Sequence, residues 1–582
     1  QLSELPLNNN GKVDRSALVA PESDQDEQHS IAPRNKIETW LQAYWQTLLN
    51  RDHVSLFDHF FQLGGDSITA TQVVSAIKRQ FNIDVSLKQF FEHCTTVEQL
   101  GHFILQQTPS TVVALPQLEH AAELKSEPFA LNPIQHAYWL GRHGHYDLGQ
   151  VACHFYTEID VHDLNLERLE RAWQILIQRH DMLRVVFSND GLKQQVQDDI
   201  PNYQIEFEDL TPLSEVSASR KLRTLREALS EKLYDTTVWP LFDVKAQQID
   251  AKTTRIYLSF DLLIADVWSF LVLSKEWQQL YNDLDVQLPA LTVTFSDYVR
   301  LLPKLEASKY YEDAWQYWLK RCETLPAAPE LPLACAPSEI EKPRFERFKQ
   351  VIPAAQWSQL KQRAKGHQVT PSMVVCTVFS QVLATWSRSS HFTLNLTLFN
   401  RLPVHDDVMS LVGDFTSLLL LEVNTQLEES FIQRVHKIQS QLLQDIEHRA
   451  VNGIDVIRQI NKQANHSQSA LMPVVFTSAL PIQEVDEQEG FPFSWLGDRN
   501  FSITQTPQVW LDHQVFEEEG ALHISWDVVE GLFPDNLIED MFAAYNQLLE
   551  QLCAFSATWQ EKYFGLLPEY QYITRKAYNN TT

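Results

Sequence analysis

Two polar stretches divide this 582-residue chain into a short helical part and a long part of mixed character. Residues 19–33 are acidic and proline-bracketed, residues 108–127 are rich in small and polar side chains, and both have the composition of linkers. Between them, apolar residues recur at spacings of three and four, beginning at Ile37 and Trp40. The sequence therefore predicts a compact all-helical domain over residues 34–107.

The long part, from residue 128 to about 555, has a different pattern. Helical periodicity, as over Leu164 to Arg179, alternates with β-branched runs such as Arg255 to Phe260. Alternation of this kind predicts an α/β arrangement of sheets covered by helices. Because a segment of this length exceeds one ordinary hydrophobic core, we expect two lobes.

The composition excludes several classes of function. Lys plus Arg number 47 and Asp plus Glu 75, a net charge of −28 that disfavours a nucleic-acid partner. The longest aliphatic run, Leu418 to Leu421, falls far short of the roughly 20 residues that span a bilayer. Six cysteines without a C-x-x-C pair indicate a cytoplasmic protein with no thiolate zinc site, and no metal site is predicted. The 16 glycines form no phosphate-binding loop of the dinucleotide or P-loop kind.

One turn in the helical part stands at a position suited to a phosphate ester. Gly64, Gly65 and Asp66 precede a helix predicted from Ser67 to Phe81, and an apolar stretch leads up to the turn. Such a turn is commonly a simple helix cap. However, the free N–H groups and the dipole at a helix N-terminus also favour an anion attached at that point.

The segment "DHFFQLGGDSITA" resembles the attachment site of a peptidyl carrier domain. The resemblance covers residues 34–107 and implies that a phosphopantetheinyl transferase attaches 4′-phosphopantetheine covalently to Ser67. The opening "LPLNNNGKVDRSAL" resembles the last motif of an adenylation domain, in which Lys12 matches the motif lysine. We therefore expect residues 1–18 to be a remnant of an upstream adenylation domain.

The long part carries a series of motifs in order. They are "FALNPIQHAYWLGR", "RHDMLRVVF", "GDFTSLLLLEV", "PVVFTSAL", "TQTPQVWLDHQ" and "WDVVEGLFP". No two of the 20 histidines are adjacent, whereas condensation domains carry a histidine pair where this chain has Phe260 to Ser269. Together the motifs resemble the heterocyclization (cyclization) domain, a branch of the condensation superfamily of nonribosomal peptide synthetases.

This resemblance implies a fold for the long part. It predicts two lobes like chloramphenicol acetyltransferase, arranged as a V-shaped pseudo-dimer around a tunnel, with boundaries at 128–305 and 306–555. Residues 556–582 resemble the linker toward a next adenylation domain. The predicted fold class is thus a small all-α four-helix carrier bundle plus a large two-lobed α/β domain.

The resemblance also implies a two-step reaction. A donor acyl or peptidyl thioester on one carrier condenses with Cys, Ser or Thr on a downstream carrier, and the new amide is cyclodehydrated to a thiazoline or oxazoline. The matching residues for cyclodehydration are Asp512, Thr477 and Asn400. An aspartate on an apolar strand can have a raised pKa, which suits acid/base chemistry. His513 is expected to point to the opposite face of the strand.

Asp261 and Asp266 match the family's signature in the loop where condensation domains have their histidine pair. For both, a structural role as carboxylates paired with arginine is an alternative. The function also has alternatives, namely a condensation-only domain that makes the amide, or a catalytically dead domain that docks carriers. The sequence leaves open whether the acceptor is Cys, Ser or Thr.

Overall fold

The computed structural model describes residues 33–63, 65, 67–107, 115–143, 147–425, 428–464, 472–480 and 491–579. The predictions for residues 1–18, including Lys12, lie outside these residues. Contacts between Cα atoms divide the chain near residue 109 into a helical unit and a large unit. Each is described by itself below.

The helical unit contains four α-helices, as predicted: α1 (Lys36–Leu48), α2 (Ser67–Phe81), α3 (Leu87–His93) and α4 (Val97–Gln106). Trp45 of α1 is fully buried, and its ring lies 4.8 Å from that of Phe60. Phe60 in turn meets Phe90 of α3 edge to face at 5.0 Å. Aromatic contacts of this kind add to the burial that holds so small a core together.

The turn before α2 is packed against this aromatic core. A Cβ added at Gly65 would lie 2.2 Å from the ring of Phe60, so only glycine fits there. Helix α2 begins at Ser67, where the sequence predicted it. The close approach of Gly65 to Phe60 therefore ties the start of α2 to the core.

Helix α4 starts with a capping box that lies one residue later than the pattern of the sequence alone indicates. Thr95 with Glu98 matches the capping-box pattern in sequence, but the structure has Thr96 as N-cap and Gln99 at the third position. Thr96 Oγ1 accepts from the Gln99 amide at 3.1 Å. The Gln99 side chain accepts from the amides of both Thr95 and Thr96, which holds the register one residue later.

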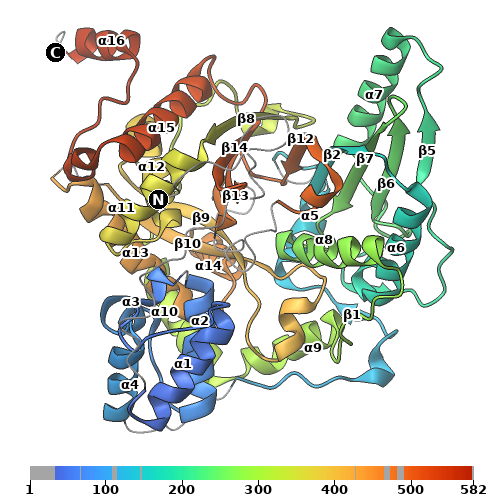
Figure 1. Ribbon diagram of the computed structural model, residues 1–582. Helices are drawn as coiled ribbons and strands as arrows, with labels where there is room; N and C mark the ends of the chain where they lie inside the picture. Colours follow the sequence, from blue (N-terminus) through green and yellow to red (C-terminus); the bar gives the residue numbers. More distant parts are fainter. Residues whose placement is uncertain are drawn as a thin grey trace, which may run out of the picture. The chain divides into compact units, whose positions relative to one another are not determined.

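The large unit begins with a lobe built on a five-stranded sheet of order β12-β2-β7-β6-β5. A small sheet of order β1-β4-β3 adjoins the five-stranded sheet. Helices α6 and α8 pack against each other over the core of this lobe (Figure 1). The elements of this part are β1 (Phe129–Ala130), α5 (Pro133–Gly141), β2 (His154–His162), α6 (Leu166–Arg179), β3 (Val185–Phe187), β4 (Lys193–Val196), β5 (Glu206–Asp209), α7 (Glu215–Ser230), β6 (Phe242–Gln248), β7 (Thr253–Asp261), α8 (Val267–Asn282), α9 (Phe295–Glu306) and α10 (Lys309–Cys322).

The second lobe is built on a six-stranded sheet of order β10-β9-β11-β13-β14-β8. Helices α11, α12 and α15 pack on one another and on this sheet, and α13 packs on β10 (Figure 1). The elements are β8 (Phe345–Ile352), α11 (Ala354–Gly366), α12 (Pro371–Trp386), β9 (His391–Phe399), β10 (Thr416–Asn424), α13 (Phe431–Glu447), α14 (Gly453–Ala464), β11 (Val474–Ser478), β12 (Asp498–Gln505), β13 (Leu511–Glu518), β14 (Ala521–Val529), α15 (Leu537–Ala554) and α16 (Glu569–Asn579).

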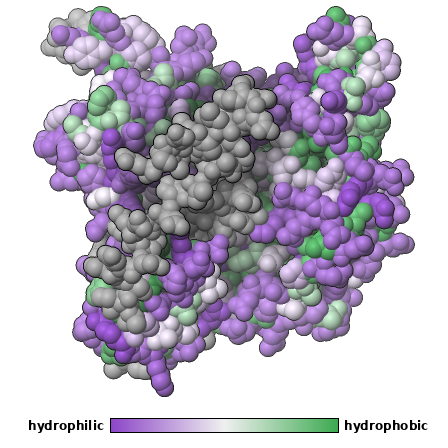
Figure 2. Space-filling model, in the orientation of Figure 1, coloured by the Kyte–Doolittle hydropathy of each residue, from purple (hydrophilic) through white to green (hydrophobic). Residues whose placement is uncertain are grey.

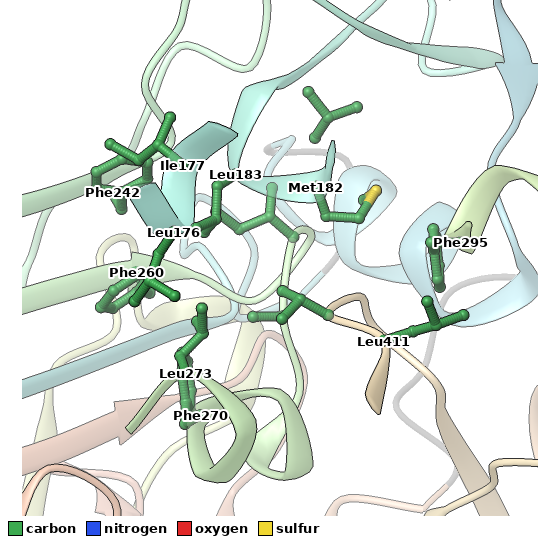
Figure 3. Packing of buried hydrophobic residues seen from close by; sticks show 14 of the residues in the cluster. Leu176, Ile177, Met182, Leu183, Phe242, Phe260, Phe270, Leu273, Phe295 and Leu411 are labelled. Carbon is green, nitrogen blue, oxygen red and sulfur yellow. The ribbon is translucent and has the colours of Figure 1, made fainter. Parts of the chain in front are cut away.

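Some segments that follow residue 305 in the sequence pack into the first lobe. Strand β12 belongs by sequence to the second lobe but pairs antiparallel with β2 in the sheet of the first. Leu411 likewise joins the core of the first lobe, where it lies near Phe295 of α9 (Figure 3). A single cut at residue 305 therefore does not separate the two cores.

The core of the first lobe is a continuous apolar cluster between its sheet and its helices. Figure 3 shows Leu176 and Ile177 of α6 beside Phe242 of β6, with Phe260 of β7 and Leu273 of α8 nearby. All five side chains are fully buried. Burial of a side chain of this size contributes about 1.5–3 kcal/mol, so this cluster holds β7 in place up to its last residue, Asp261.

The surface is mostly polar on the face displayed, with small separate apolar areas among the described residues (Figure 2). In the described part of the chain, no single helix combines the length and apolar character of a membrane span. Only the pair α11 and α12, bent by 100° where they join, meets that test together.

Candidate active site

A pocket of about 130 Å³ lies in the large unit between the two sheets. Its walls come from both lobes and are mainly apolar. The polar or ionisable side chains that line it are Tyr138, Cys153, Asp266, Thr397, Thr416, Thr477, Thr504, Thr506, Asp512 and Gln514.

Asp512 lies on β13 at the wall of this pocket, as a partly buried carboxylate. Oδ2 accepts a hydrogen bond from Gln514 Nε2 at 2.6 Å, and Oδ1 accepts one from Thr477 Oγ1 at 3.4 Å. Thr477 lies on the parallel neighbour β11, and its Oγ1 is also within hydrogen-bond distance, 3.0 Å, of Thr397 Oγ1. The structure thus brings the predicted residues Asp512 and Thr477 together.

The surroundings of Asp512 favour its protonated form. Burial, and after it the negative charge of Asp527, raise the pKa of the Asp512 carboxyl to about 7. Hydrogen bonds from Gln514 and Thr477 and the nearby Arg347 cation act in the opposite direction. A group with a pKa near neutrality can both give and take a proton at physiological pH, as acid/base catalysis requires.

His513 points to the other face of β13, as predicted from the alternation of the strand. Its side chain is fully buried, and its Nε2 lies 2.9 Å from the Tyr545 hydroxyl on α15. Burial lowers the pKa of His513 to about 3, so the ring is neutral. His513 therefore serves the packing of α15 on the sheet.

Asn400 is not part of the pocket lining among the described residues. It follows β9, and its Nδ2 donates to the backbone carbonyl of Arg449 at 3.0 Å. Its Oδ1 is buried without a hydrogen-bond partner. The structure therefore does not bring Asn400 together with Asp512 and Thr477, and its role stays a prediction.

Asp261 ends β7 as a fully buried carboxylate paired with Arg142 of the segment after α5. Its Oδ1 also accepts from the Leu263 amide at 3.0 Å. Burial lowers the pKa of the Arg142 guanidinium to about 10, yet it stays charged at neutral pH. These contacts fit the structural alternative, in which Asp261 fixes the loop after β7.

Asp266 caps helix α8 and is also fully engaged. Its Oδ1 accepts from the Ser269 amide at 2.7 Å and from Arg401 Nη2 at 2.9 Å, while its Oδ2 accepts from the Phe415 amide at 3.2 Å. The residue lies in the pocket wall, but its side chain is not exposed. Asp266 therefore joins the two lobes through Arg401 and Phe415.

We expect Asp266→Ala to destabilise the large unit by about 3–5 kcal/mol, because the change leaves the buried Arg401 cation without its partner. The midpoint of chemical denaturation measures this. Asp285→Ala, an exposed residue just after the same helix, is the matched control and should change stability by less than about 0.5 kcal/mol. An Asp266→Ala protein of normal stability that forms no amide would instead show a catalytic role.

Sequence reasoning missed Gln514, although a signal was available. Gln514 stands two residues after Asp512, and a strand places residues i and i+2 on the same face. It also missed Arg347 and Asp527, which lie on β8 and β14. Asp527 lies in the motif "WDVVEGLFP", but nothing in that motif indicates a role beside Asp512. Arg347 has no local signal, because only strand pairing brings it to the neighbourhood of Asp512.

Comparisons with known families match this architecture. The family model "Condensation domain" matches residues 125–569, and the model "Phosphopantetheine attachment site" matches residues 39–104. The chain therefore belongs to the condensation-domain family and carries a phosphopantetheine-binding domain ahead of it. That carrier family holds 4′-phosphopantetheine covalently, so the predicted cofactor is confirmed, while Ser67 as its attachment point stays a prediction.

Individual relatives point to the cyclization branch. The crystal structure of the EpoB cyclization-docking bidomain from Sorangium cellulosum is 34% identical, with a TM-score of 0.72, and covers 85% of this chain and 94% of that one. Pyochelin synthetase PchE of Pseudomonas aeruginosa is 37% identical over 451 residues, 76% of this chain and 30% of that protein. Phenyloxazoline synthase MbtB of Mycobacterium tuberculosis is 34% identical over 485 residues, 81% of this chain and 33% of that protein.

These findings confirm the predicted family and fold class. The chain combines a carrier domain with a two-lobed heterocyclization domain of the nonribosomal peptide synthetase type. It spans only a tenth to about two fifths of the curated relatives that it matches.

Proposed function

We propose that this chain condenses a carrier-bound acyl or peptidyl thioester with carrier-bound Cys, Ser or Thr and then cyclodehydrates the amide to a thiazoline or oxazoline. The observation that carries the proposal is Asp512, a pocket-lining carboxyl with a pKa of about 7 that is held by Thr477 and Gln514. The names of the relatives, a phenyloxazoline synthase and a cyclization bidomain among them, support the same class of product.

In the first step the acceptor α-amine attacks the donor thioester carbonyl, a C–N bond forms, and the donor thiol leaves with the proton. A thioester is already activated, so placing both reactants in one pocket supplies much of the acceleration. The pocket walls come from both lobes, which suits substrates that enter on separate carriers.

In the second step the acceptor thiol or hydroxyl attacks the carbonyl carbon of the new amide. The protonated Asp512 carboxyl gives its proton to the carbonyl oxygen and takes the proton of the attacking group as the ring C–S or C–O bond forms. It then gives that proton to the new hydroxyl, whose C–O bond breaks so that water leaves, and regains a proton from the amide N–H as the C=N bond forms. An amide oxygen does not leave unprotonated, so this step depends on a positioned proton carrier. Thr477 and Gln514 orient the carboxyl, and the mainly apolar wall of the pocket limits access of bulk water.

The carrier function rests on the start of α2. Ser67 is its first residue, and a 15-residue helix presents free N–H groups at that end, a setting that fits a phosphate ester. When bound there, 4′-phosphopantetheine supplies the thiol on which the acyl group is held. We propose Ser67 as the attachment residue and a phosphopantetheinyl transferase as the enzyme that modifies it.

The wider assembly follows from the same proposal. We propose an upstream adenylation domain, whose end would be residues 1–18, and downstream adenylation and carrier domains reached through residues 556–582. The carrier domain would span 34–107 and the two lobes 128–305 and 306–555. All six cysteines are free, which supports the proposed location in the reducing cytoplasm.

The experiment that tests the function supplies the phosphopantetheinylated full chain, loaded with an acyl donor, with separate carriers bearing Cys, Ser or Thr. Intact mass spectrometry of the acceptor carriers gives the product. We expect amide minus one water with at least one of the three acceptors. Amide alone would indicate the condensation-only alternative, and no transfer with any acceptor would indicate the carrier-docking alternative.

A further inference from the structure

Three charged side chains stand side by side across three neighbouring strands next to the pocket. In the antiparallel pairing, Asp512 of β13 lies directly opposite Asp527 of β14, and Asp527 lies directly opposite Arg347 of β8. Side chains directly opposite one another on a sheet face are only about 4.5–5.5 Å apart at Cβ. Two carboxylates therefore share one side of the sheet with a single arginine.

Arg347 pairs with Asp527 and not with Asp512. Arg347 forms a two-pronged contact with Asp527, in which Nε donates to Oδ1 at 2.6 Å and Nη2 donates to Oδ2. Asp527, 1% exposed, also accepts from Thr504 Oγ1 at 2.6 Å. The hydrogen bonds to Asp512, in contrast, come from the neutral donors Gln514 and Thr477.

A hydrogen-bonded chain links the ion pair to Asp512. Gln514 Nε2 donates to Thr504 Oγ1 at 2.5 Å as well as to Asp512 Oδ2, and Thr504 donates onward to Asp527. Arg347 Nη2 approaches Gln514 Oε1 at 3.5 Å, which favours the amide orientation that presents Nε2 to Asp512. The ion pair of Arg347 and Asp527 thus sets the orientation of the Gln514 side chain, which in turn holds the Asp512 carboxyl.

The geometry points to Asp527 and Arg347 as a positioning pair, which holds Gln514 against Asp512 and in which Asp527 keeps the Arg347 cation away from Asp512, so that Asp512 can carry a proton. This inference rests on the proposed cyclodehydration. If Asp512 met Arg347 directly, the contact would favour its ionised form, which has no proton to donate. The pair therefore separates a carboxyl that is bound by an arginine, Asp527, from one that is held by neutral donors, Asp512.

The charged and titratable groups around Asp512 agree with this role. Asp527 raises the pKa of Asp512, and Arg347 lowers it. From α5, Tyr138 also faces the pocket, and burial raises the pKa of its hydroxyl well above the usual value, so it stays neutral. Cys153 beside it is likewise neutral, because burial raises the pKa of its thiol to about 12.

The test compares pH profiles of ring closure, measured by mass spectrometry on the full chain with a cysteine-loaded acceptor carrier. Because Asp512 must hold a proton to expel water, closure declines above its pKa. In Asp527→Asn the raising charge is gone, and we expect the decline to move about one pH unit lower. In Arg347→Met the lowering charge is gone, and we expect it to move about one unit higher.

Two further variants complete the design. The double variant Arg347→Met/Asp527→Asn leaves neither partner of the ion pair buried without the other, so it keeps the test usable if a single variant does not fold. Its pH profile should lie between the profiles of the two single variants. Lys361→Met breaks an ion pair with Glu517, on the opposite face of β13, and should leave the profile in place.

The failures of the inference and of the proposed function are distinguishable. The positioning role is supported if the pH profiles of the two single variants shift in opposite directions. It is also supported if only one single variant folds, its profile is shifted, and the profile of the double variant lies between that profile and the one expected for the other single variant. The positioning role is contradicted if the wild type closes rings and the folded variants have the same pH profile as the wild type. It is also contradicted if the folded variants lose amide formation and ring closure in parallel. Wild type that never closes a ring would overturn the proposed function instead.

Discussion

Asp512→Asn should accumulate the uncyclised amide on the acceptor carrier and form almost no ring. Condensation starts from a reactive thioester, so amide formation should stay measurable. Cyclodehydration must expel the oxygen of an unreactive amide, and a positioned proton carrier contributes about 10²- to 10⁴-fold to such a step. A time course of the tethered product masses measures both rates in one reaction.

The variant should keep the fold. Asparagine has the shape of aspartate, its Oδ1 can accept from Gln514 Nε2, and it removes a buried carboxyl that stands opposite Asp527. Thr477→Ala is the milder partner, with ring closure slowed about 5- to 10-fold, the effect of one lost hydrogen bond. If Asp512→Asn closes rings at the wild-type rate, or loses amide and ring equally while folded, Asp512 does not serve the second step.

Ser67→Ala should abolish the mass gain that a promiscuous phosphopantetheinyl transferase produces on the full chain. The reason is chemical: the transferred group needs a hydroxyl oxygen to form its phosphate ester, and alanine has none. Since the donor is then no longer held, transfer from this chain to the acceptor should also stop. Intact mass spectrometry of the chain before and after the transferase reaction gives the result directly.

A serine of the same helix provides the matched control. Ser75→Ala, eight residues further along α2, should accept the group as the wild type does. A mass gain that survives Ser67→Ala would show that another side chain is modified and would contradict the carrier assignment.

Much of the fold was predictable because its signals are local. The start of α2 at Ser67, the end of α6 at Arg179 and the core of β7 follow from periodicity and from turn residues. The position of β12 in the sheet of the first lobe was not predictable, because it depends on pairing with β2, which lies more than 300 residues earlier in the sequence. The same holds for Leu411 in the core beside Phe295.

The site shows the same division. Asp512 and Thr477 came from motifs, and the two parallel strands that carry them bring them together. Asn400 came from a motif as well, but its side chain turns to Arg449 instead of the pocket. Arg347 lies in no motif, because a residue on β8 reaches the site only through two strand pairings, and its partnership with Asp527 was therefore not predictable.

The most direct measurement of the central claim bypasses the first step. An acceptor carrier already bearing the uncyclised acyl-cysteinyl amide is incubated with the full chain, and its mass is followed over time. The account predicts loss of one water with the wild type and, with Asp512→Asn, a loss slowed by about 10²- to 10⁴-fold. An amide that keeps its full mass in the presence of folded, amide-forming wild type would contradict cyclodehydration by this pocket.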